Sequence, residues 1–166
     1  MFRALCKVNN ILNKILTGFI ILLLLVMSGM VFTQVIFRFV LSKPIAWSEE
    51  LSTYLFSFLA YFGAAVVLKA DGHISVNSFV ERLPAGLQKW VKVLAHCIVL
   101  TFLSVVVYMS SGLVAQVLSN GQTLVNIDFL PIGYIFMKIP ISYSIMALFT
   151  IEKIIRTIKP ELDVAA

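Results

Sequence analysis

Long stretches without a charged side chain constrain this chain more than any other feature. Residues 15–37, 51–68 and 93–127 contain no Asp, Glu, Lys or Arg. A helix rises about 1.5 Å per residue, so roughly 20 apolar residues cross about 30 Å of hydrocarbon. Hydrophobic residues make up 60% of the sequence, more than a water-soluble fold can bury. The chain is therefore expected to be an integral membrane protein.

Four spans are expected, at about 15–38, 50–69, 92–118 and 132–155. The third should end at Ser119-Asn120-Gly121, and the fourth carries Lys138 and Pro140 in its first turns. The fold class is an all-α integral membrane protein, with a single four-helix transmembrane domain over residues 1–166. No internal repeat of the kind found in many complete secondary transporters is evident.

Basic residues on alternate sides of the spans predict the orientation, because cytoplasmic loops carry the Lys/Arg excess. One side holds ten of them: Arg3, Lys7, Lys14, Lys69, Arg82, Lys89, Lys92, Lys153, Arg156 and Lys159. The other side holds Arg38, Lys43 and Lys138. Both termini are therefore expected in the cytoplasm. Topology and attraction to membrane lipid then account for the net charge of +5, without nucleic acid as a partner.

The connection between the second and third spans has a helical apolar pattern. Ile74, Val76, Phe79, Val80 and Leu83 alternate with polar residues before Pro84. This pattern predicts an amphipathic helix on the cytoplasmic surface. The stretch up to Asn13 is also expected to lie along the surface.

Ionisable residues within a span are candidates for function. Lys138 would either line a polar pathway or extend its long stem to the periplasmic surface, and the second interpretation is favoured. His96 would need a second axial ligand to hold haem. Cys6 and Cys97 form no disulfide framework or metal-ligand spacing. With no nucleophile beside a base and no phosphate loop, we expect a non-catalytic chain without a cofactor.

A polar cluster precedes the second span: Arg38, Trp47, Glu49 and Glu50. Acidic groups favour a helix start, Ser48 is a plausible N-cap, and Arg38 would pair with a glutamate to join two helices. The alternative is a docking surface for a periplasmic partner.

Small side chains form one face of the second span. Thr53, Ser57, Ala60 and Ala64 recur at helical spacing, with Gly63 beside them. Such a face permits close helix approach, either inside the bundle or to a larger partner.

These residues resemble the DctQ-type small membrane subunit of tripartite ATP-independent periplasmic (TRAP) transporters. The resemblance covers nearly the whole chain and rests on Phe37-Arg38, Trp47-Ser48-Glu49-Glu50-Leu51, Gly63, Asp71-Gly72-His73-Ile74, Leu83-Pro84 and Ile139-Pro140-Ile141. The chain departs from many members, which carry a basic residue near Thr53 and a tryptophan near Phe58, and the substrate subtype stays open.

The resemblance implies a bacterial inner-membrane scaffold. A large membrane subunit would carry the sodium and substrate sites and move by an elevator-like mechanism, and a periplasmic binding protein would deliver an organic acid such as sialic acid or a C4-dicarboxylate. The residues assigned to a partner interface or the family motif are Arg38, Trp47, Glu49, Glu50, Thr53, Ser57, Ala60, Gly63, Ala64, Gly72 and His73.

Two other classes remain as alternatives. A membrane anchor of a respiratory enzyme complex would hold haem or quinone, and His96 alone favours it. A self-contained exporter would need an acidic residue within a span to couple protons, and Glu49 and Glu50 lie too near the surface.

Overall fold

The computed structural model describes residues 2–43, 45–70, 85–124 and 131–158. These residues form the helices α1 (Phe2–Phe39), α2 (Ala46–Lys69), α4 (Ala85–Ser119), α5 (Ile132–Phe136) and α6 (Lys138–Ile158). Four stretches are long and apolar enough to cross a membrane, with α5 and α6 together making the fourth. The expected all-α, four-span fold is confirmed. The expected amphipathic helix, with Gly72 and His73 before it, lies outside the described residues.

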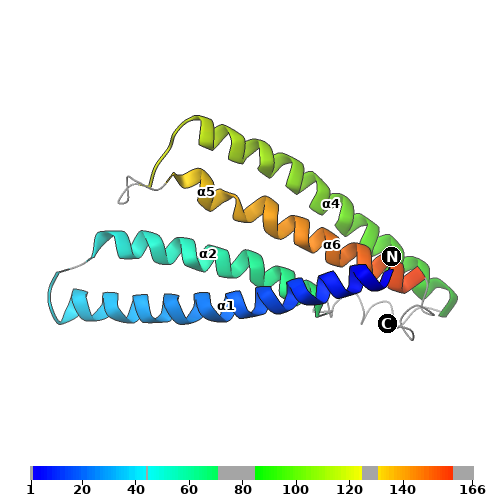
Figure 1. The fold of residues 1–166 in the computed structure, drawn as a ribbon, viewed down its shortest axis with the longest axis horizontal. Helices are drawn as coiled ribbons and strands as arrows, with labels where there is room; N and C mark the ends of the chain where they lie inside the picture. Colours follow the sequence, from blue (N-terminus) through cyan, green and yellow to red (C-terminus); the bar gives the residue numbers. More distant parts are fainter. Residues whose placement is uncertain (1, 44, 71–84, 125–130, 159–166) are drawn as a thin grey trace.

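The helices pack side by side in the order α1, α2, α6, α4 (Figure 1). Helix α1 also touches α6, near the end of the molecule that carries the N-terminus. The α1–α2 pair and the α4–α6 pair converge at that end and spread apart at the other (Figure 1). Contacts that join the two pairs therefore decide how the layer is held together.

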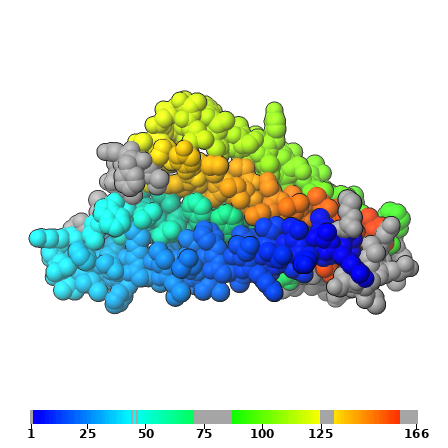
Figure 2. All heavy atoms as spheres, viewed as in Figure 1, coloured from blue at the N-terminus to red at the C-terminus, as the bar shows by residue number. Residues whose placement is uncertain are grey.

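Helix α1 is one continuous element of 38 residues, or about 57 Å at 1.5 Å per residue. This is nearly twice the hydrocarbon thickness of about 30 Å. The stretch before Asn13 does not fold back along a surface but continues the spanning helix, so that expectation was wrong. No proline occurs in α1 to break it. In Figure 2, α1 is exposed along its whole length.

The apolar core is small and lies where α1, α2 and α6 meet. It contains Leu16, Phe62, Ala65, Leu68 and Phe149. The Phe62 ring packs edge-on against Phe19 and is stacked with Phe58, at centroid distances of 5.6 and 6.0 Å. Most other large apolar side chains point outward, as expected for a protein whose surrounding solvent is lipid.

The fourth span is interrupted at Met137. Pro140 has no amide N–H to donate to the Phe136 carbonyl, and its ring crowds that carbonyl, so the helix loses one hydrogen bond and is distorted at this point. The amide of Met137 donates to the Gly133 carbonyl and that of Ile141 to the Met137 carbonyl, each over 3.2 Å. Helix α6 therefore begins at Lys138.

Helix α5 lies tightly against the end of α4. A β-carbon on Gly133 would come within 2.6 Å of the Leu118 side chain, so glycine permits this approach. Helix α4 ends at Ser119, at the expected position, and Gly121 follows with a φ of +62°.

Candidate functional site

The small side chains of α2 lie mainly on its outer face. Thr53, Ala60 and Ala64 are exposed. A β-carbon built on Gly63 would meet nothing within 4 Å. The opposite face carries Phe62 into the core. An outer face of small residues can be approached closely by another helix.

Ser57 is the member of this set that turns inward. It is half-buried, and its hydroxyl oxygen accepts a hydrogen bond from the Lys138 ammonium. That ammonium also lies over three aromatic rings of α2, 4.9 Å from Phe58, 5.6 Å from Tyr54 and 5.9 Å from Tyr61. Cation–π attraction to ring faces and one hydroxyl together replace part of the lost hydration.

Lys138 is only 5% exposed, so the prediction that it extends to the periplasmic surface was wrong. Helix α6 begins at this residue, and its side chain reaches Ser57 of α2. Ser57 stands halfway along α2 (Ala46–Lys69). The ammonium is therefore held near the middle of that helix.

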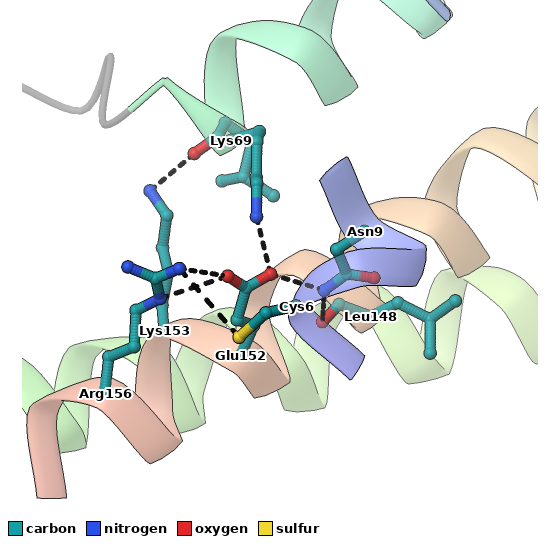
Figure 3. A network of polar contacts seen from close by, with 8 residues as sticks. Cys6, Asn9, Lys69, Leu148, Glu152, Lys153 and Arg156 are labelled. Atoms are coloured by element: carbon teal, nitrogen blue, oxygen red, sulfur yellow. Dashed lines mark hydrogen bonds and ion pairs between the residues drawn. The ribbon is translucent and has the colours of Figure 1, made fainter. Parts of the chain in front are cut away.

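Glu152 forms the second buried polar site, near the convergent end of the helices (Figure 3). Lys69 Nζ donates to its Oε2 over 2.5 Å and Asn9 Nδ2 donates to the same oxygen over 2.6 Å. Arg156 donates to Oε1 through Nε, over 3.0 Å, and its terminal nitrogen lies 2.8 Å from the same oxygen. One carboxylate, 2% exposed, thus joins α1, α2 and α6.

Further bonds surround this carboxylate (Figure 3). Asn9 Nδ2 also donates to the Leu148 carbonyl over 3.3 Å, and Lys153 Nζ donates to the Leu68 carbonyl over 2.5 Å. A terminal nitrogen of Arg156 lies 3.9 Å from Cys6 Sγ. The network satisfies the cations and the carboxylate mutually, as buried charges require.

Sequence reasoning singled out Lys138 and His96 among the ionisable residues of the spans and missed Glu152. One signal was present. Glu152 and Arg156 are four residues apart, the spacing that places two side chains on one helix face. The partners from α1 and α2 are distant in sequence, so spacing alone could not identify them.

The residues of the polar cluster before the second span do not form one site. The N-cap of α2 is Ile45, with no side-chain cap, whereas Ser48 is 3% exposed inside the first turn, so the Ser48 cap prediction was wrong. The Arg38 guanidinium lies 6.0 Å from the Phe39 ring. Among the residues described, it forms no ion pair with Glu49 or Glu50. The expected tie between the two helices is therefore absent at this point.

Trp47 and Glu49 are exposed at the start of α2, and Glu50 is half-buried. On α4, the His96 ring donates through Nδ1 to the Lys92 carbonyl of its own helix over 2.6 Å. Within the described ranges, no three His, Cys, Asp or Glu side chains gather in a way that could hold a metal ion.

The chain is similar to known proteins over most of its length. The family described as "Tripartite ATP-independent periplasmic transporters, DctQ component" matches residues 27–159. A Haemophilus influenzae protein, described as a candidate TRAP transporter small permease protein, is 29% identical over 158 residues, covering 95% of this chain and 94% of that protein.

Two further relatives carry more specific names. The sialic acid TRAP transporter small permease protein SiaQ of Vibrio cholerae is 32% identical over 77 residues, covering 46% of this chain and 42% of that protein. The isethionate TRAP transporter permease protein DctMQ of Oleidesulfovibrio alaskensis is 27% identical over 101 residues, covering 61% of this chain but 16% of that longer protein.

Proposed function

Because this chain belongs to the DctQ family, the small subunits of TRAP transporters, we propose that it is the non-catalytic scaffold of such a transporter. Its partner is a large membrane subunit that carries the substrate and sodium sites. The observation that carries the proposal is the outer face of α2, where small side chains remain exposed although the opposite face is packed. A scaffold needs such a face and needs no charged transport site of its own.

The relation to the longer permease DctMQ supports a large partner. The matched segment is 16% of that protein, so in that relative a sequence like this one is part of a much longer permease chain. A face of Thr53, Ala60, Gly63 and Ala64 suits a neighbouring helix, because helices in lipid associate through close van der Waals packing at small residues.

Bulky substitutions on this face test the proposal. Ala60→Phe with Ala64→Phe should prevent close approach of the partner and reduce both copurification of the large subunit and uptake at least tenfold. Ala115→Phe, which adds the same bulk at an exposed position of α4, is the matched control and should leave both unchanged. Normal assembly and uptake in the α2 variant would show that the large subunit does not pack against this face.

The family and the named relatives support an inference about the substrate and the coupling ion. We infer sodium-coupled uptake of an organic acid, with sialic acid or a C4-dicarboxylate as the candidates; the name of the Vibrio cholerae relative supports the first. Ten basic residues against three on alternate sides favour an inner-membrane orientation with cytoplasmic termini. The start of α2 then faces the periplasm.

A periplasmic binding protein would dock at this end, and the exposed Glu49 with its neighbour Glu50 is the candidate contact. Reversing both charges, by Glu49→Lys and Glu50→Lys, should reduce binding-protein-dependent uptake, because like charges would then oppose a basic patch on the partner. Uptake rates at several binding-protein concentrations measure the effect. Neutral Gln at both positions should give a smaller loss, and unchanged uptake after reversal would dismiss the contact.

A further inference from the structure

Three cationic side chains line one side of α1 before its apolar segment. Arg3, Lys7 and Lys14, with Asn10 between them, recur at intervals of four, three and four and so share one face. All four are exposed. In the described part of the chain no hydrogen bond or ion pair engages the three cationic side chains. Together with Cys6 and Ile11 these residues line a hollow of about 470 Å³.

A second cavity adjoins the first at Asn10. It has a volume of about 130 Å³ and lies between α1, α2 and α6, where Lys69, Glu152, Lys153 and Arg156 complete its lining. The two hollows thus bring together six cationic side chains and one carboxylate. Because Glu152 is already bonded to two of the cations (Figure 3), the described lining keeps a strong positive excess.

The position along α1 places Lys14 at the border of the hydrocarbon layer, with Lys7 about 10 Å and Arg3 about 16 Å further out at 1.5 Å per residue. The charge-free segment 15–37 follows Lys14 directly and is long enough to fill the hydrocarbon layer. Basic side chains just outside such a segment lie among the head groups. Beside the cationic stripe runs an apolar one, because Val8, Ile11 and Ile15 are 52%, 48% and 61% exposed and share the adjoining face.

We propose that this surface binds one anionic phospholipid, with its phosphate between Lys7 and Lys14, Arg3 adding attraction from further out, and an acyl chain along the exposed Ile15 and Leu22. Guanidinium and ammonium groups donate charge-assisted hydrogen bonds to phosphate oxygens. A free phosphate ion would use the cations but not the apolar stripe, so the pairing of the two stripes favours a lipid. This inference does not rest on the transporter assignment.

The test is lipid retention by the purified full-length chain in neutral detergent, counted by native mass spectrometry. Equal amounts of dioleoyl phosphatidylglycerol, which is anionic, and dioleoyl phosphatidylcholine, which is zwitterionic, are offered. The phosphatidylglycerol should bind preferentially. The triple variant Arg3→Gln, Lys7→Gln and Lys14→Gln should lose affinity by about fivefold per cation removed. The charge-retaining triple variant Arg3→Lys, Lys7→Arg and Lys14→Arg should bind as the parent does.

The matched control removes two exposed cations at the other end of α1 and just beyond it, by Arg38→Gln and Lys43→Gln. This variant should retain as much lipid as the parent. Circular dichroism checks that each variant keeps its helix content. Equal retention of both lipids, or unchanged retention in the triple Gln variant, would overturn the proposal. Displacement of the lipid by inorganic phosphate at equal concentration would also overturn it, since the site would then be one for a free anion.

Discussion

Among the residues that the structure describes, Glu152 and Lys138 are the buried charged side chains, and each is stabilised differently. Glu152 has three charged or amide donors from three helices, whereas Lys138 has one hydroxyl and three ring faces from α2. The sequence contains both residues at unremarkable positions near helix ends. Apart from Arg156, four residues from Glu152, the partners could not be predicted, because they come from segments about 80 to 140 residues away in sequence and depend on how the helices cross.

Removing the Glu152 charge should destabilise the protein. In Glu152→Gln the partly buried Lys69 and its neighbour Arg156 lose their carboxylate, and an uncompensated buried charge costs about 3 kcal/mol or more. The double variant Lys69→Met with Glu152→Met should recover most of this loss. The midpoint of heat denaturation in detergent, followed by tryptophan fluorescence, is the measurement.

Glu49→Gln is the matched control for that experiment, because Glu49 is an exposed carboxylate and its removal should shift the midpoint little. A Glu152→Gln protein as heat-resistant as the parent would contradict the bonding described for this network.

At the scale of the helix, the interruption between α5 and α6 has the largest structural consequence. Charge-free runs were enough to predict the first three spans, the apolar stretch 132–155 predicted the fourth although it contains Lys138, and Ser119 to Gly121 predicted the end of α4. Pro140 was visible in the sequence, but the side on which Lys138 lies was not, since its contacts are with the hydroxyl and rings of α2. The straight continuation of α1 was missed because charges near Lys14 suggested a surface segment.

Lys138 clamps the start of α6 to α2, which gives a second prediction. Lys138→Ala should leave an unfilled space beside Tyr54, Phe58 and Tyr61 and lower the unfolding free energy by about 2 kcal/mol. Lys138→Met, which refills the space without a charge, should cost less than half as much. Chemical denaturation in mixed detergent micelles measures both.

An exposed lysine supplies the comparison for the clamp. Lys43→Ala should have almost no effect on the same denaturation curve. If Lys138→Ala behaved like Lys43→Ala, the side chain would be reaching solvent, and the buried contact with Ser57 would not exist in the membrane.

For the whole molecule, two helix pairs form a layer that is joined by polar contacts at one end and by Lys138 halfway along α2. Such a layer has two broad apolar faces and a small core, so it is suited to stand beside a larger protein. Composition and charge patterning predicted the membrane class, the number of spans and the small-residue stripe of α2. They could not predict which faces of the layer stay open, because that depends on the packing order α1, α2, α6, α4.

The scaffold account is tested most directly by purifying the affinity-tagged chain from its native membranes under mild detergent. A large multi-span protein should copurify at a fixed ratio, and vesicles should take up the organic acid only when both proteins and the binding protein are present. Uptake by vesicles that contain this chain alone, or the absence of a large membrane protein from the material purified from native membranes, would contradict the account.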